Sequence, residues 1–400
     1  MADVLKPAFF VLFIFICGAQ SDCILDLNKD FGNPGPVLIK DGGFLAPNAD
    51  GGEFVLKRSE TVLVACPGTK RRVVVANVTS GYNELEAHCI INSTFRVERQ
   101  IAKFKDIKCS SQPFFSTEVE PGNCAENSQL YGVGYKIKQQ FYKLYRACFD
   151  KNTLHTSYVE HELTPASVYS QNKVNRPAFV EGTLFGSAKM SALYNIKHQK
   201  SRLDAILGSK MADLYLTKQQ FLTRGHLAAR ADYSTSAEMR GTFHYVNTAP
   251  QWMRGNAGDW AALEEALRRR VKTRGSPAVV YTGTHGVMTL PDNQNQMKEF
   301  YLHVDENNNQ LVPVPMYYYK LVYDPKQKTA AAFITINSSF YNNTIINDLE
   351  FCDDICAGNK NYNWLKWRSS DGTHSFCCDY KQFVEEIDYL PKLDVIGQFY

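Results

Sequence analysis

The residues best suited to chemistry lie in two short stretches of the chain. The first, FLTRGHLAAR at residues 221–230, places Arg224 two positions before His226 in an otherwise apolar run. A guanidinium beside an imidazole can bind a phosphate while the imidazole, which titrates near neutral pH, takes a proton from water. The same residues could also end an ordinary strand with a solvated charge. The first stretch alone does not decide between these two readings.

The second stretch, NAGDWAALEEALRRRVK, predicts a helix that begins at Asn256 and ends near Lys272. Residues four apart lie along one line of a helix, and this line carries the amide of Asn256, the carboxylate of Glu264 and the guanidinium of Arg268. A Glu/Arg pair at this spacing most often only supports its helix. The stripe beside the line is apolar and is expected to face the core. Its members are Leu263, Leu267 and Val271.

If a short strand pair places these groups opposite the first stretch, the two sets of side chains together would be sufficient for hydrolysis of a phosphodiester. Asn256 offers a hard oxygen to Mg²⁺, which binds few protein ligands and keeps most of its waters, and Glu264 would organise those waters. His226 would take the proton from the attacking water. Arg224 and Arg268 would offset the charge that develops on a phosphate polarised by the metal.

The order and separation of these groups resemble those of the DNA/RNA non-specific endonucleases of the ββα-metal (His-Me finger) class. The resemblance covers roughly residues 175–340 and is greatest to secreted arthropod nucleases, including the double-strand-preferring DNases and duplex-specific nucleases of crustaceans. A cysteine-bearing N-terminal domain, a late CC pair and the segment HLAARADY fit that subgroup. The matching positions are Arg224, Gly225, His226, Asn247, Asn256, Glu264 and Arg268.

The resemblance implies a role for each matching side chain. His226 is the general base, and Asn256 is the direct ligand of magnesium, for which manganese can substitute. Arg224 and Arg268 are catalytic and substrate-binding residues that contact the phosphate. Glu264 acts through metal-bound water.

Asn247, the remaining catalytic position, is expected by the same resemblance to shape the site and to reach the scissile group. One departure is visible, because many members have Asp-Arg-Gly-His where this chain has Thr223 before Arg224. The aspartate is expected to be a supporting hydrogen-bond partner, and Thr223 can supply part of that role. Asp232 is expected to be a structural or surface residue.

The substrate that the resemblance implies is double-stranded DNA, cut to leave 5′-phosphate and 3′-hydroxyl ends in digestive or extracellular degradation. Contacts to phosphate do not distinguish the sugar or the strand number, so a nuclease for double-stranded RNA or for both sugars is an alternative. A second alternative is a secreted polyanion-binding protein without turnover, since residues 221–275 carry nine basic and five acidic side chains. Binding alone, however, needs neither Asn256 nor Glu264. No membrane and no protein partner is expected.

The N-terminus indicates a secreted protein. Residues 1–21 have one lysine followed by an apolar run that is too short for a bilayer, which needs about 20 apolar residues, and they predict a signal peptide. Without Cys17, ten cysteines remain, and this even number predicts disulfides, although the sequence does not show which cysteines pair.

The last four cysteines could form a zinc site, but their spacing and the oxidising environment of a secreted protein favour two disulfides. They are Cys352, Cys356, Cys377 and Cys378. Secretion also permits glycosylation at the sequons of Asn77, Asn92, Asn337 and Asn342.

The chain is long enough for two domains, and the predicted fold class is α+β. Residues 22–150 hold six cysteines and short β-type runs, which predict a disulfide-linked, β-rich N-terminal domain. Residues 165–400 alternate helix-like segments with β-branched and aromatic runs. They predict a nuclease domain with a mixed or antiparallel sheet and flanking helices. The polar stretch between the domains is expected to be a linker that exposes His155 and His161.

Overall fold

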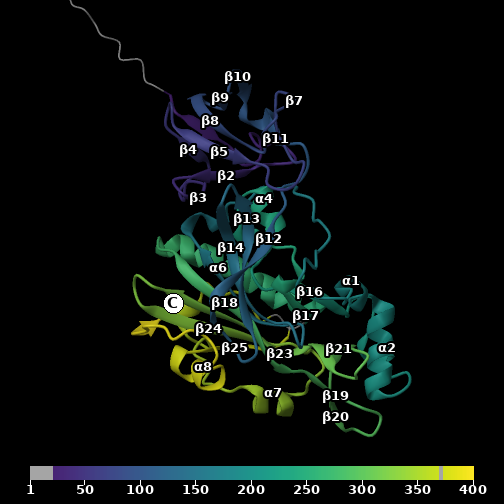
Figure 1. The fold of residues 1–400 in the computed structure, drawn as a ribbon. Helices are drawn as coiled ribbons and strands as arrows, with labels where there is room; N and C mark the ends of the chain where they lie inside the picture. Colours follow the sequence, from purple (N-terminus) through teal and green to yellow (C-terminus); the bar gives the residue numbers. More distant parts are fainter. Residues whose placement is uncertain (1–20, 369–372) are drawn as a thin grey trace, which may run out of the picture.

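Short β-branched runs separated by Gly, Pro and Asn form a first unit made almost wholly of strands (Figure 1). The computed structural model describes residues 21–368 and 373–400, so the predicted signal peptide lies outside the described residues except for its last position. In this N-terminal unit (residues 21–109), six strands form a sheet of order β10-β9-β8-β5-β2-β3, beside the sheet β11-β6-β7 and the pair β1-β4. Its strands are β1 (Cys23–Leu25), β2 (Val37–Lys40), β3 (Gly43–Phe44), β4 (Phe54–Leu56), β5 (Thr61–Ala65), β6 (Val73–Val75), β7 (Val78–Thr79), β8 (Glu84–Ile91), β9 (Thr94–Val97), β10 (Gln100–Lys103) and β11 (Ile107–Cys109).

The rest of the chain is built on one nine-stranded sheet with the order β12-β13-β14-β15-β18-β23-β24-β25. All neighbours along this path are antiparallel, and β26 pairs in parallel with β24. The predicted α+β class with a mixed sheet is therefore confirmed. The strands are β12 (Ser116–Asn123), β13 (Gln129–Ile137), β14 (Gln140–Asp150), β15 (His155–Leu163), β18 (Ala278–Val287), β23 (Pro315–Asp324), β24 (Thr329–Ile336), β25 (Ser375–Cys378) and β26 (Gly397–Gln398).

This sheet crosses the domain boundary that the sequence suggests at residue 150. β14 pairs with β15, and β15 then pairs with β18, so the stretch expected to be a linker is an interior strand. His161 lies opposite Val280 and is buried instead of exposed, and His155 begins the strand. The polar residues of this stretch do not predict a buried strand. Their polar groups can be buried because residues distant in the sequence form hydrogen bonds with them. The N-terminal unit ends about forty residues earlier than expected, before β12 begins.

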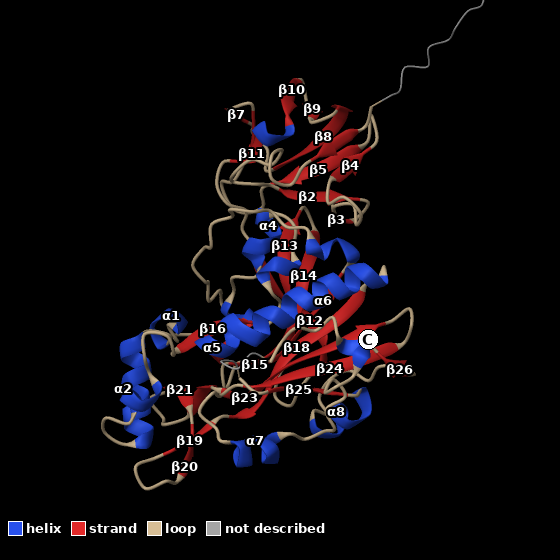
Figure 2. Ribbon diagram, turned by 180° about the vertical axis from the view of Figure 1, so that it is seen from behind, coloured by secondary structure: helices blue, strands red, loops and turns tan. Residues whose placement is uncertain are grey.

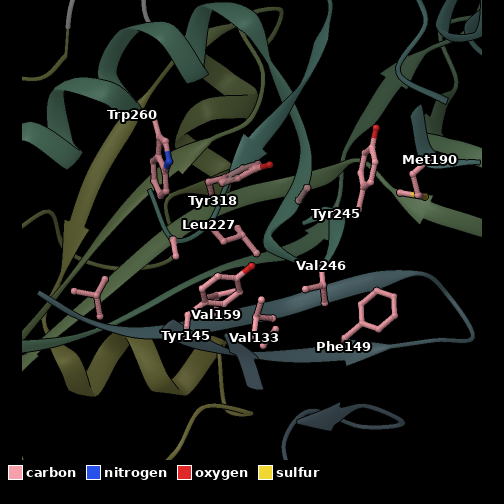
Figure 3. Close-up of a cluster of buried hydrophobic side chains, with 14 of the residues drawn as sticks. Val133, Tyr145, Phe149, Val159, Met190, Leu227, Tyr245, Val246, Trp260 and Tyr318 are labelled. Atoms are coloured by element: carbon pink, nitrogen blue, oxygen red, sulfur yellow. The ribbon is translucent and has the colours of Figure 1, made fainter. Parts of the chain in front are cut away.

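Both faces of the large sheet are covered, because successive side chains on a strand point to opposite faces. Tyr318 packs in the core beneath helix α6 (Ala261–Arg274), while the adjacent Tyr319 packs in the opposite core with Phe383 of α8 (Tyr380–Glu386). The apolar stripe predicted for the helix is buried in the first of these cores. Figure 3 shows part of that core, and Figure 2 shows α6 lying across the sheet.

Smaller elements complete this part of the chain. The strand pair β16-β17 belongs to the candidate site, and two further hairpins and several short helices surround it. These elements are α1 (Met190–Leu193), α2 (Ile196–Leu207), α3 (Ala212–Tyr215), β16 (Leu222–His226), α4 (Ser236–Gly241), β17 (Thr248–Trp252), α5 (Met253–Gly255), β19 (Thr289–Pro291), β20 (Met297–Glu299), β21 (Tyr301–Val304), β22 (Gln310–Pro313) and α7 (Asn343–Leu349). Within the described ranges, no helix combines the length and apolarity needed to cross a membrane.

All ten cysteines expected to form disulfides are paired. The late group forms two disulfides, which excludes the zinc alternative because no thiolate remains to bind a metal. The pairs are Cys23–Cys89, Cys66–Cys109, Cys124–Cys148, Cys352–Cys378 and Cys356–Cys377. One sequon is incompatible with the fold, because Asn337 is buried and its amide donates to the carbonyls of Pro250 and Pro315. The folded core leaves no room for a glycan there.

Candidate functional site

The two stretches singled out in the sequence meet in a strand-strand-helix unit. β16 and β17 pair antiparallel, with Arg224 opposite Pro250 and His226 opposite Thr248. The chain then passes through α5 and a kinked segment at residues 256–260 into α6. The kink lies at Gly258, whose backbone angles (φ −100°, ψ −113°) are not helical. The predicted helix therefore exists from residue 261 onward, but it does not run unbroken from Asn256.

A cavity of about 800 Å³ opens beside this unit. Four of the six predicted site residues line it, namely Arg224, His226, Asn256 and Glu264. The two others, Asn247 and Arg268, lie outside its lining. The fold thus brings four of the predicted side chains into one cavity: an imidazole, an amide, a carboxyl group and a guanidinium.

His226 is held between aromatic rings and has a free nitrogen. Its imidazole lies 5.0 Å from the ring of Phe179 and 5.1 Å from that of Phe243, measured between centroids. Nε2 is buried and has no hydrogen-bond partner among the described residues. Burial, followed by the charges of Arg176 and Arg230, lowers the pKa of His226 to about 3. The imidazole is therefore neutral at physiological pH and able to accept a proton.

Asn256 is oriented by the residue that departs from the family pattern. Its Nδ2 donates to Thr223 Oγ1 at 2.8 Å, and that hydroxyl donates to the backbone oxygen of Gln251 at 2.8 Å. Thr223 thus supplies a supporting hydrogen bond, as expected. Because the amide nitrogen is engaged, Oδ1 is the atom of Asn256 left to bind a cation or a water.

Arg224 lies in a cage of aromatic side chains. Its Nε donates to the Tyr245 hydroxyl at 2.9 Å, and the guanidinium lies over the rings of Tyr194, Phe179 and Tyr245, closest to Tyr194 at 4.8 Å. Within the described residues it has no carboxylate partner. Cation-π contacts fix the guanidinium without neutralising it, so Arg224 remains available to an anion.

Glu264 is the only acidic residue that lines the cavity within the described part of the chain. Burial raises the pKa of its carboxyl group to about 7, although the nearby Lys320 opposes the shift. Lys320 is itself buried and donates to the backbone oxygen of Leu227, directly after His226, and to Thr282. Burial lowers the pKa of Lys320, and Glu264 opposes that change. The carboxyl group is thus poised to ionise when a further cation approaches.

Arg268 is not among the residues that line the cavity and contacts a buried carboxylate. Its Nη1 donates to Asp232 Oδ1 at 2.8 Å, and Asp232 Oδ2 lies 2.8 Å from His161 Nε2. In this structure the guanidinium of Arg268 is paired with Asp232, and its contact with a phosphate stays a prediction. Asp232 is structural, as expected, and its partner His161 comes from the strand that the sequence concealed.

Asn247 is fully buried and uses its whole side chain on the backbone. Its Nδ2 donates to the carbonyls of Ala228 and Thr242 at 2.9 and 3.0 Å, and its Oδ1 accepts from the Ala228 N–H at 2.8 Å. These bonds fix the chain just after His226. Both N–H groups of the Asn247 amide are used in this way, so the amide has no donor left for a phosphate oxygen of the scissile group.

Two cationic residues of the cavity were not predicted. Arg176 and Arg230 both line it and both act on the imidazole of His226. Arg230 lies in the stretch at residues 221–230, only four positions after His226, so the sequence could have suggested that it lies near the site. Arg176 lies in a polar segment that resembles a linker, and no sequence spacing connects it with the site.

Comparison with known proteins places the chain among nucleases. A model of the DNA/RNA non-specific endonuclease family matches residues 126–383. The chain is 28% identical over 359 residues to the salivary endonuclease of Lutzomyia longipalpis. The aligned region covers 88% of this chain and 79% of that protein. It is 23% identical over 388 residues to salivary protein Tsal2A of Glossina morsitans morsitans, covering 94% of each. A chain in the crystal structure of the EndoG/EndoGI complex is 20% identical, with a TM-score of 0.34, and covers 51% of this chain and 76% of its own length.

The family match begins at residue 126, between β12 and β13 of the nine-stranded sheet. It therefore includes β13, β14 and β15, which pair with the rest of that sheet. Its start lies upstream of the domain boundary that the sequence suggests.

Proposed function

The chain belongs to the DNA/RNA non-specific endonuclease family, and from this premise we propose that it is a magnesium-dependent endonuclease that cuts double-stranded DNA. Manganese can substitute for magnesium in this proposal, and the products carry 5′-phosphate and 3′-hydroxyl ends. The observation that carries it is the neutral imidazole of His226 in one cavity with Asn256 and Glu264. A surface that only binds anions has no need of such a base.

The donor set of the cavity fits a small hard cation. Asn256 Oδ1 is a neutral oxygen held by the bond to Thr223, and Glu264 supplies a carboxyl group that can ionise. Magnesium accepts few protein ligands and keeps several waters, so one amide oxygen and one carboxylate acting through water suffice. When bound, the ion would polarise the phosphate and stabilise the departing oxygen.

The side chains of the protein have separate parts in this proposal. The imidazole of His226 accepts the proton of the attacking water, since its lowered pKa keeps it neutral. Arg224 binds the scissile phosphate from its aromatic cage. We assign Asn247 and Arg268 to positioning: Asn247 fixes the chain after His226, and Arg268 holds Asp232.

Secretion is supported by the five disulfides, by the signal-like N-terminus and by the salivary origin of the two relatives. We place the activity in digestive or other extracellular degradation of nucleic acid. Glycans are proposed only at exposed sequons such as Asn77 and Asn92. Double-stranded RNA is the alternative substrate, because the contacts named above are to phosphate and do not select the sugar.

The test is cleavage of a plasmid, a single-stranded DNA, a double-stranded RNA and a DNA/RNA hybrid, each with Mg²⁺ and with EDTA. Duplex DNA is expected to be cut fastest, and both EDTA and His226→Ala are expected to abolish cutting. His303→Ala, outside the cavity lining, is the matched control and should retain activity. Survival of all four substrates with persistent DNA binding would instead support a polyanion-binding protein. Cutting of double-stranded RNA alone would keep the mechanism and overturn the substrate.

A further inference from the structure

A second pocket is lined by residues of both the N-terminal unit and the nuclease domain. Its volume is about 230 Å³, and we call it the junction pocket. The N-terminal unit contributes Asn28 and Asn33 to its lining, and the nuclease domain contributes Arg240 from α4. The pocket shares the wall residues Arg176, Pro177, Arg230 and Phe243 with the catalytic cavity. The junction pocket therefore adjoins the candidate active site.

The lining of the junction pocket is cationic and holds no acid. Its four basic residues are Lys173, Arg176, Arg230 and Arg240. None of them forms an ion pair within residues 21–368 and 373–400, although nineteen ion pairs occur there. Burial, together with the nearby Arg176, lowers the pKa of Arg230, as expected when like charges converge. Four cations gathered without a counter-charge disfavour one another, and a bound anion would relieve this repulsion.

The remaining lining suits a nucleotide better than a simple inorganic anion. Six amide side chains surround the cations, and amides can both donate to and accept from the edges of bases and the sugar. They are Asn28, Asn33, Gln112, Gln171, Asn172 and Asn175. The ring of Phe243 forms part of the wall and carries the guanidinium of Arg176 at 5.9 Å. Its volume of about 230 Å³ is below that of a usual pocket for a drug-sized ligand, about 300 Å³ or more, so it has no room for more than one nucleotide of a strand.

The N-terminal unit is attached firmly enough to form one side of such a site. Asn28 Oδ1 accepts from the Asn172 N–H at 2.8 Å, and the Tyr169 hydroxyl donates to the Asp50 carbonyl at 2.6 Å. Tyr169 also lies under the ammonium of Lys272 from α6, at 4.5 Å. The pocket wall from the N-terminal unit is thus bonded to the domain that carries His226.

We propose that the junction pocket is a nucleotide-binding subsite that holds a phosphate and base flanking the scissile phosphate on the strand being cut. This inference rests on the proposed function, because it takes the adjoining cavity as the place where the scissile phosphate binds. It gives the N-terminal unit a part in substrate binding. Arginine and lysine hold the flanking phosphate, and the amides contact the sugar and base.

The test measures binding separately from cleavage. A short fluorescein-labelled DNA duplex is titrated in EDTA with the full chain carrying His226→Ala, and fluorescence anisotropy gives the Kd at several salt concentrations. Adding Lys173→Gln and Arg240→Gln, which line only the junction pocket, is expected to raise Kd about tenfold and to lower the salt slope by about 1 for each lost phosphate contact. The matched control is Arg99→Gln with Lys381→Gln, an equal loss of charge at exposed positions outside both pockets, and it should change Kd less than about twofold.

A second variant tests the contribution of the N-terminal unit. Asn28→Asp keeps the acceptor oxygen for the Asn172 N–H but places a negative charge in the pocket, and it should weaken binding as well. Wild-type affinity and salt slope in both Lys173→Gln/Arg240→Gln and Asn28→Asp would overturn the subsite. Weakened binding by these variants while the unsubstituted enzyme cuts no substrate would keep the subsite as a binding site and overturn the proposed catalysis.

Discussion

Arg268 and Asp232 form a buried ion pair behind the catalytic cavity, with Nη1 2.8 Å from Oδ1. The side chains are 13% and 3% exposed, so water screens the pair little. Burial would raise the pKa of Asp232, but the hydrogen bond with His161 and the charge of Arg268 outweigh it and hold the pKa well below its usual range. The carboxylate therefore joins α6 to strand β15.

Removing this carboxylate is expected to destabilise the protein strongly. Asp232→Ala leaves Arg268 buried without its partner, and the loss of one partner of a buried pair costs about 3–5 kcal/mol. The measurement is the Tm by calorimetry, which should fall by several degrees. The control is Glu265→Ala on the same helix, which removes the exposed partner of Arg269 and should change the stability by less than about 1 kcal/mol. Equal effects of the two substitutions would contradict the structural role assigned to Asp232.

Glu264 is expected to cost stability at alkaline pH. Its pKa is about 7 in the folded chain, above the ordinary value of 4.5, so the unfolded chain ionises first as the pH rises. Stability is unaffected below about pH 4.5, falls between there and about pH 7, and is lower by about 3 kcal/mol above that range. Glu264→Gln should therefore raise the Tm in EDTA more at pH 8.5 than at pH 4, while abolishing cleavage.

The exposed neighbour on the same helix provides the control for this pH dependence. Glu265→Gln should alter the Tm by a similar small amount at both pH values, because an exposed carboxyl group ionises alike in the folded and unfolded chains. A Tm gain for Glu264→Gln that does not grow with pH would show that burial does not raise the pKa of that carboxyl group.

The sequence predicted those parts of the site whose spacing is local. Asn256 and Glu264 lie only eight positions apart, on either side of the kink at Gly258, and Arg224 and His226 lie on one strand, so their types and separations were informative. The contact of Arg268 with Asp232 could not be read in this way, because it depends on how α6 lies across the sheet. His161 was misassigned for the same reason, since a polar stretch becomes an interior strand only when distant strands supply its neighbours. The part played by Arg176 likewise depends on a segment that has no regular structure.

The charge of Arg176 is expected to be one cause of the low pKa of His226. Burial is the larger cause, and the positive charges of Arg176 and Arg230 add to it because they disfavour a protonated imidazole. Arg176→Gln should therefore raise the pKa of His226 toward its ordinary value of 6.5. The measurement is the pH titration of the imidazole by NMR, with Arg254→Gln, an exposed cation outside the cavity, as the control. An unchanged titration in Arg176→Gln would remove that charge as a cause.

Thr223 is expected to control the metal requirement through Asn256, which it holds by the 2.8 Å bond from Nδ2. Thr223→Val has nearly the same shape but no hydroxyl, so the amide of Asn256 loses the partner that fixes its orientation. Loss of a group that orients a metal ligand typically lowers metal affinity or activity about 10- to 100-fold. The measurement is the Mg²⁺ concentration that gives half-maximal cleavage, which should rise in Thr223→Val and remain near the original value in Thr223→Ser. A general loss of folding would lower the Tm and the amount of active protein, but it would not shift the Mg²⁺ dependence in the one variant and spare it in the other. Equal Mg²⁺ dependence in both variants would show that the bond between Thr223 and Asn256 does not prepare the cation site.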